Sequence, residues 1–145
     1  MKSSPAGWPR ISSALFYQDA ARAIDWIRNA FGFEIRIKVD GEGGKIAHAE
    51  LVFGDGLIMI GSVDPGRPGA EARRSPRDIG GGNTQGLLVY VDDADAHCER
   101  ARLAGARIVS EPKTVDHGEG YWADRICEIE DIEGHRWWFA HRVRG

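Results

Sequence analysis

The order of apolar and polar positions along the chain occurs twice. Each copy opens with an apolar run, continues with a stretch of helical periodicity that ends at a glycine, and closes with extended segments of alternating character. The apolar runs are residues 11–17 and 87–91, and the extended segments are 33–39, 45–53, 57–60, 107–109, 121–131 and 135–140. Each half therefore predicts the order β-α-β-β-β.

An offset of 73 residues aligns the two halves without a gap, residues 15–35 on residues 88–108. Chance would give about one or two identities in an alignment of this length. The identical pairs are Leu15/Leu88, Tyr17/Tyr90, Asp19/Asp92, Ala21/Ala94, Ala23/Ala96, Gly32/Gly105 and Ile35/Ile108. Such self-similarity indicates an internal duplication.

Both helical stretches carry end signals and one apolar face. Asp19 and Asp92 are predicted N-caps, and Gly32 and Gly105 are predicted as the glycines that follow the last helical turn. The predicted buried faces are Ile24, Ile27 and Phe31 in the first helix, and Ala94, Cys98 and Ala101 in the second. The second face is thin, because its side chains are small.

The last turn and strand of each half repeat at an offset of 78 residues, which aligns Glu50 with Glu128. The extra five residues are expected in a longer loop over 112–120. We interpret the two glutamates as solvated or ion-paired strand residues rather than as a carboxylate pair for acid–base chemistry.

A segment rich in glycine and proline separates the halves. Residues 61–86 hold seven of the 19 glycines and three of the six prolines, a composition typical of a flexible connector. We expect one domain over 1–145, with modules at about 9–61 and 85–142 and a linker at 62–84. One such module would leave a sheet face uncovered. The predicted fold is α+β, with the two modules forming a curved mixed sheet around a cleft and helices on its outer face.

Composition excludes several classes of protein. The 145 residues are 42% hydrophobic and 28% charged, with a formal net charge of −3, so neither disorder nor a nucleic-acid surface is indicated. No apolar run approaches the length of a membrane span. Cys98 and Cys127 match no disulfide or metal motif, so we expect reduced thiols and a cytoplasmic protein.

Paired β-α-β-β-β modules resemble the vicinal oxygen chelate superfamily, which includes glyoxalase I, bleomycin-resistance proteins and extradiol dioxygenases. The residues Tyr121–Arg125 and Asp131–Trp138 are similar to the ending of its PhnB-like branch. They depart from it at Ala123, Ile132 and Glu133, where the branch usually has Gly, Pro and Phe. The resemblance implies a homodimer and a substrate cavity inside the curved sheet.

The resemblance also implies four metal-ligand positions, which fall here on Ser12, Ile60, Gln85 and Trp138. Only Gln85 is a ready ligand, and a bound divalent metal needs at least about three N or O ligands from the protein. We therefore expect no metal and no other cofactor. The alternative is a rearranged site that combines Gln85 with His48 and Glu50, which lie two apart on one face of a predicted strand.

Aromatic residues gather around one arginine near the end of the chain, as expected for a cleft that binds a planar or anionic organic molecule. Strand alternation and the resemblance point Trp138 to the cavity and Trp137 to the core. The candidate ligand-binding residues are His48, Glu50, Gln85, Tyr121, Trp122, Arg125 and Trp138. The pattern assigns no catalytic residue.

The function predicted from the sequence is metal-independent binding of a small organic molecule in an aromatic cleft, either to sequester it or to transform it by chemistry that the sequence does not specify. A metal-dependent lyase, isomerase or dioxygenase with the rearranged site is one alternative. A non-catalytic interaction or regulatory module is the other. Nucleic acids and membranes are not expected as partners.

Overall fold

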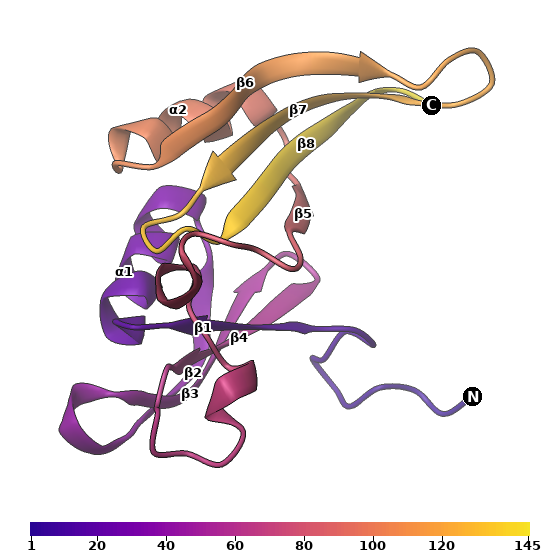
Figure 1. The fold of residues 1–145 in the computed structure, drawn as a ribbon. Helices are drawn as coiled ribbons and strands as arrows, with labels where there is room; N and C mark the ends of the chain where they lie inside the picture. Colours follow the sequence, from indigo (N-terminus) through magenta and orange to yellow (C-terminus); the bar gives the residue numbers. More distant parts are fainter.

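The computed structural model describes residues 1–145 as two β-α-β-β-β modules that follow one another along the chain (Figure 1). The first module consists of β1 (Ser13–Tyr17), α1 (Ala20–Phe31), β2 (Glu34–Asp40), β3 (Ile46–Phe53) and β4 (Gly56–Ser62). The second consists of β5 (Leu87–Tyr90), α2 (Ala94–Leu103), β6 (Arg107–Asp116), β7 (Ala123–Glu130) and β8 (Arg136–Arg144). Neither helix has the length and apolar composition of a membrane span.

Each module contributes one mixed sheet of four strands. The strand orders are β1-β4-β3-β2 and β5-β8-β7-β6, with β1/β4 and β5/β8 parallel and the other pairs antiparallel. The strands β1 and β5 are edges of separate sheets, so the expected curved sheet is divided between them. Both helices lie on one side of the strands (Figure 1). We call the sheet surfaces that point away from the helices the open face.

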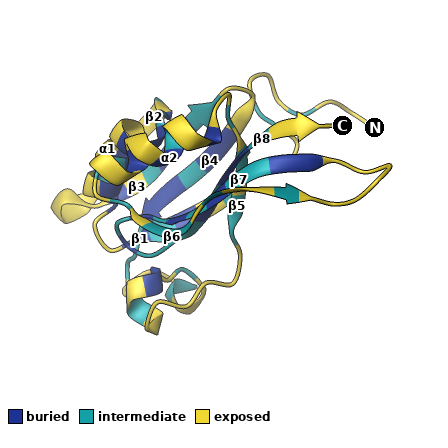
Figure 2. Cartoon of the chain, turned by 90° about the horizontal axis from the view of Figure 1, so that it is seen from above, coloured by how far each residue is buried: buried dark blue, intermediate teal, exposed yellow.

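One hydrophobic core joins the two modules between the helices and the sheets. Phe31 of α1 packs on Trp137 and Phe139 of the other module, with ring centroids 5.1 and 4.7 Å apart. Burial of one large apolar side chain contributes roughly 1.5–3 kcal/mol. Figure 2 shows both helices exposed on their outer surfaces and buried toward the strands. The helix α1 therefore holds the second sheet as well as its own.

The helix ends confirm the first predicted N-cap and correct the second. The Asp19 side chain accepts from the backbone N–H of Arg22, and Gly32 ends α1 with a left-handed φ of 80°. The helix α2 is capped by Asp93, which accepts from the N–H of Ala96, and the predicted cap Asp92 precedes it. The strand and helix starts of the two modules are thus 74 residues apart, one more than the alignment of identities.

The connector is more ordered than its composition predicts. It forms two short 3₁₀ turns, Ala70–Ala72 and Pro76–Ile79, and the second begins with a capping box between Ser75 and Asp78. The Arg77 guanidinium donates to the carbonyl of Ile132 at 2.7 Å. These hydrogen bonds fasten the end of the connector to the turn between β7 and β8.

The expected loop over 112–120 is largely strand. The strand β6 continues to Asp116, which pairs with Ala123 across a long hairpin. Two register shifts in the β6/β7 ladder, between Ile108 and Ser110 and between Ser110 and Lys113, absorb extra residues. The loop is therefore confined to residues 117–122.

Candidate functional site

The open face of the second sheet carries an apolar and aromatic surface. On β8, Trp137 and Phe139 are buried in the core, so the alternate residue Trp138 projects from the opposite face. Leu88 lies opposite Trp138 in the parallel β5/β8 ladder, and Tyr90 follows on the same face of β5. Leu88 is 53% and Tyr90 47% exposed. We call Trp138, Leu88 and Tyr90 the aromatic face.

Trp138 is supported from below by a glycine. A Cβ atom built on Gly86 would lie 2.2 Å from Cζ3 and 2.7 Å from Cη2 of the Trp138 ring. No side chain fits at that distance, so the indole occupies the space that any other residue at position 86 would fill. The aromatic face therefore depends on this glycine.

The strand registers correct two of the four implied metal-ligand positions. Ile60 is 1% exposed and packs in the core, while its neighbour Met59 pairs with Glu50 as Trp138 pairs with Glu128. The same registers make Gly86, not Gln85, the counterpart of Ser12. A one-residue slip moves a side chain to the other face of a strand, which is why the sequence alignment missed these positions.

The residues at the corrected positions do not fit a divalent metal. Ser12, Met59, Gly86 and Trp138 present a hydroxyl, a thioether, no side chain and an indole, whereas such ions are held by imidazole, carboxylate or thiolate groups. Gln85 donates to the Ser13 hydroxyl at 3.2 Å. No three His, Cys, Asp or Glu side chains come together anywhere in the chain in an arrangement that could hold a metal ion.

His48 and Glu50 do share a face, as predicted, but on the first sheet. The His48 Nε2 atom lies 2.7 Å from Glu50 Oε2, and the Arg36 Nε atom lies 3.8 Å from Glu50 Oε1. Glu50 is 5% exposed. Glu128 on the second sheet is separately paired with Arg136 at 3.0 Å. Each glutamate thus has its own cationic partner, as the sequence interpretation expected.

Arg125 does not belong to the aromatic face. Its guanidinium makes two hydrogen bonds, of 2.7 and 2.9 Å, to Asp95 in the first turn of α2. Hydrogen bonding to Asp95 raises the pKa of Arg125, and the pKa of Asp95 is lowered by the same contact. The side chain that could be free to bind a ligand is engaged on the helix side of the sheet.

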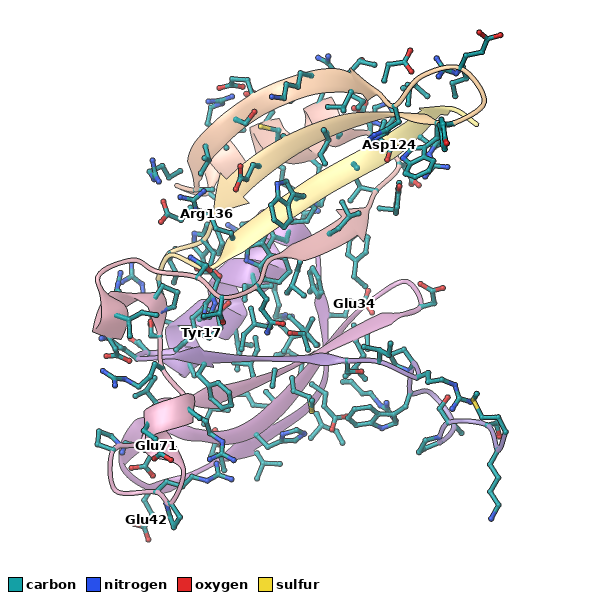
Figure 3. The ribbon with its side chains drawn as sticks, turned by 45° about the vertical axis from the view of Figure 1, so that its right-hand side comes forward. Tyr17, Glu34, Glu42, Glu71, Asp124 and Arg136 are labelled. Carbon is teal, nitrogen blue, oxygen red and sulfur yellow. The ribbon has the colours of Figure 1, made fainter.

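A different arginine connects the aromatic residues, and the sequence analysis missed it. The Arg142 guanidinium carbon lies 5.4 Å from the Tyr90 ring and 5.6 Å from the Trp122 ring. Arg142 and Tyr90 both hydrogen-bond Asp124, at 2.6 and 2.8 Å (Figure 3). Burial opposes the charge of Asp124, but these hydrogen bonds hold its pKa below the ordinary value. Their alternate positions on β8 and β5 are the only sequence signal.

Tyr121 and Trp122 lie at the tip of the β6/β7 hairpin, where they are 64% and 40% exposed. Trp122 reaches the aromatic face through Arg142, whereas Tyr121 contacts only Trp122 among the aromatic rings, at 6.4 Å. The structure thus brings Trp138 and Trp122 to one face of the second sheet. His48 and Glu50 lie on the first sheet.

Two hollows adjoin the aromatic face. An apolar groove of about 400 Å³ runs along the seam between the sheets and is lined by Leu88 and Tyr90, with Ile11, Phe53 and Leu57. A smaller cavity of about 140 Å³ lies between β1, the connector and the start of β8. Ser13 and Leu87 line both hollows, so they are neighbours at the seam.

A buried polar cluster below the smaller cavity is built on two carboxylates. Glu133 accepts from the Ser75 hydroxyl at 2.7 Å and from the backbone N–H groups of Gln18 and Asp19 at 2.6 and 2.8 Å. Asp131 accepts from the hydroxyl of Tyr17 at 2.7 Å. Burial raises the pKa of both Tyr17 and Asp131. The cluster joins β1, the connector and the β7–β8 turn, which indicates a structural role.

Comparison with known proteins agrees with this architecture. The glyoxalase/bleomycin resistance protein/dioxygenase superfamily model matches residues 10–139. The uncharacterized proteins Mb0911c of Mycobacterium bovis and Rv0887c of Mycobacterium tuberculosis are each 32% identical over 136 residues, which cover 94% of this chain and 85% and 76% of theirs.

Among solved structures, TioX from Micromonospora sp. ML1 is 29% identical, with a TM-score of 0.69 over 93% of this chain and 99% of its own. The antibiotic-binding protein TnmS3 from Streptomyces sp. CB03234 shares the fold, with 17% identity and a TM-score of 0.66 over 99% of both chains. The family match spans nearly all of the described strands and both helices. The chain belongs to the glyoxalase/bleomycin resistance protein/dioxygenase superfamily.

Proposed function

We propose that this protein binds a small aromatic organic molecule on the aromatic face, without a metal ion. The observation that carries the proposal is the replacement of two ligand positions by a ring and the space for it, Trp138 over Gly86. An indole with one face open to a cleft stacks on planar ligands, and the adjoining groove of about 400 Å³ has room for a small molecule.

The surroundings of Trp138 support this proposal. Leu88 and Tyr90 extend the apolar surface, and Arg142 holds Tyr90 and Trp122 in fixed positions by cation–π contacts and hydrogen bonds. Fixed aromatic side chains lose little conformational entropy on binding. The fold that this chain shares with the antibiotic-binding protein TnmS3 hosts such a function in at least that relative.

Isothermal titration calorimetry against a panel of polycyclic aromatic antibiotics tests the proposal. We expect saturable binding by at least one compound, unchanged by excess chelator and weakened about tenfold by Trp138→Leu, because loss of stacking costs about 1.4 kcal/mol. Trp26→Leu is the matched control, since the Trp26 indole donates to Ala104 on the helix side. Binding that requires a metal, or that survives Trp138→Leu unchanged, would contradict the proposal.

Three further predictions accompany this function. The C-terminal sequence supports membership of the PhnB-like branch, although Glu133 has a role of its own in this chain. Half-exposed Leu88 and Tyr90 on an edge strand support pairing of two copies into a homodimer, which native mass spectrometry would test. The two free thiols, Cys98 and Cys127, support a cytoplasmic location, which cell fractionation would test.

A further inference from the structure

The smaller cavity beside the aromatic face has a lining that suits an anion. Its charged side chains are Arg74 and Arg136, and no aspartate or glutamate lines it. The one titratable ring there, His135, has its Nε2 atom hydrogen-bonded to the carbonyl of Phe16 at 2.8 Å. The remaining polar side chains are the hydroxyls and amides of Ser13, Asn83, Thr84 and Gln85. Guanidinium groups among neutral hydrogen-bonding groups are typical of carboxylate or phosphate recognition.

Arg136 has an unused donor at this cavity. Its Nη1 atom donates to Glu128 Oε1 at 3.0 Å, but its Nε atom is buried and has no hydrogen-bond partner. A buried N–H group without an acceptor is destabilising, so an acceptor bound at this atom would be favoured. The backbone N–H of Arg136 donates to Asn83 Oδ1 at 3.2 Å, which holds the connector against the start of β8.

Arg74 contributes a second cation from the connector. Its Nε atom lies 3.8 Å from Asp78 Oδ2, and its Nη2 atom donates to the Asp78 carbonyl at a long 3.3 Å. The side chain is 44% exposed, so this ion pair is loosely held. Arg74 is therefore able to turn toward an anion in the cavity.

The cavity and the aromatic face lie within reach of one small molecule. Arg136 and Trp138 project from the same face of β8 two residues apart, which is about 7 Å along a strand. Gln85 lines the cavity, and the next residue, Gly86, supports the Trp138 ring. Figure 3 shows Arg136 at the end of β8 that lies near the connector.

We infer that this cavity binds the acidic group of an aromatic ligand, a carboxylate or sulfonate, whose ring stacks on Trp138. Arg136 pairs with the anion through its free Nε–H, and Arg74 approaches from the connector. The inference rests on the proposed function, since it names the chemical class of ligand for the same face. It predicts that aromatic acids are preferred over neutral compounds of the same shape.

A matched pair of fluorescent probes tests the inference. Anilinonaphthalenesulfonate and phenylnaphthylamine share their rings and differ in the sulfonate. We expect the sulfonate to bind the full chain at least about tenfold more tightly than the neutral probe. Arg136→Gln should reduce the affinity for the sulfonate about tenfold and leave the neutral probe unchanged, and Arg74→Gln should act in the same direction. Arg107→Gln is the control, because Arg107 pairs with Glu130 and does not line the cavity.

The outcomes separate the two proposals. Equal affinity for both probes, with Arg136→Gln and Arg74→Gln changing neither, would overturn the anion site while leaving the aromatic face in place. Absence of binding by either probe, or binding unaffected by Trp138→Leu, would overturn both. Because Arg74 lies on the exposed connector, its variant remains informative even where Arg136→Gln disturbs the pairing with Glu128.

Discussion

The Trp138 indole lies so close above Gly86 that a Cβ atom there would stand 2.2 Å from the ring. Gly86 precedes β5, and Trp138 lies on β8, the parallel neighbour of β5. The two residues are complementary in volume, because the ring takes up the space that the glycine leaves open. The pair stands where the family resemblance implies metal ligands, so the change from ligand chemistry to stacking surface involves both positions together.

Gly86→Ala should disturb the aromatic face without unfolding the protein. The added methyl group displaces the Trp138 ring, since contact at 2.2 Å is not tolerated by a rigid indole. We expect an affinity for an aromatic ligand about tenfold lower and an altered near-ultraviolet circular dichroism spectrum. Calorimetry and circular dichroism measure the two effects.

Gly66→Ala provides the control for this substitution. A Cβ atom at position 66 would meet only Asp64 Oδ1, at 3.7 Å, and the φ of Gly66 is not in the left-handed region. We expect wild-type affinity and an unchanged spectrum. Wild-type binding by Gly86→Ala, with an unchanged near-ultraviolet spectrum, would mean that the glycine does not set the position of the ring.

Glu133→Ala should lower the stability of the fold. Glu133 accepts three hydrogen bonds that tie the start of α1 and the connector to the β7–β8 turn. Its removal leaves two backbone N–H groups and a buried hydroxyl without an acceptor, and we expect a free energy of unfolding lower by about 2–4 kcal/mol. Urea denaturation measures it. The exposed Glu71 is the control, and Glu71→Ala should change the stability by less than about 0.5 kcal/mol.

The duplication, the elements and the family were predictable because periodicity and identities persist over half the chain. The register was not predictable at the level of one residue. Identities aligned Asp19 with Asp92, whereas the caps in the structure are Asp19 and Asp93. Because side chains alternate along a strand, this slip was enough to choose Ile60, a core residue, instead of Met59.

The site was predicted only in part, because side-chain partners depend on tertiary packing. Trp138 and the core residue Trp137 were assigned to the correct faces by strand alternation. Arg125, a ligand candidate, is instead engaged by Asp95 of α2, a contact between residues 30 positions apart. Arg142 entered the site through a long β8 strand whose last residues the hydrophobic pattern did not include.

Both cysteine thiols should be unreactive in the folded protein. Cys98 and Cys127 are 0% and 1% exposed, and burial raises the pKa of each, that of Cys127 to about 12. The thiolate is the reactive form, so a chromogenic disulfide reagent at neutral pH should label neither thiol on the time scale of a free cysteine. In denaturant it should label both. Rapid labelling of the native chain would show that the second helix opens readily.

His97 should make the fold less stable in acid. Its ring lies among Phe139, Phe53 and Phe31, with centroids 4.3, 6.1 and 6.3 Å away, and its Nε2 atom is buried without a partner. Burial, with a smaller effect of Arg100, lowers the pKa of His97 to about 4. In the unfolded chain the pKa returns to about 6.5, so the unfolded state takes up the proton first as the pH falls.

The stability that neutral His97 contributes is therefore present above about pH 6.5 and is lost between there and pH 4. The full difference corresponds to roughly 3 kcal/mol, and because the ring keeps part of its contact with water we expect a loss of about 1–2 kcal/mol. Urea denaturation from pH 7 to pH 4 measures it. His97→Phe should remove this part of the slope, while His117→Gln on the exposed hairpin loop should keep it. An equal slope in wild type and His97→Phe would assign the acid sensitivity to other groups.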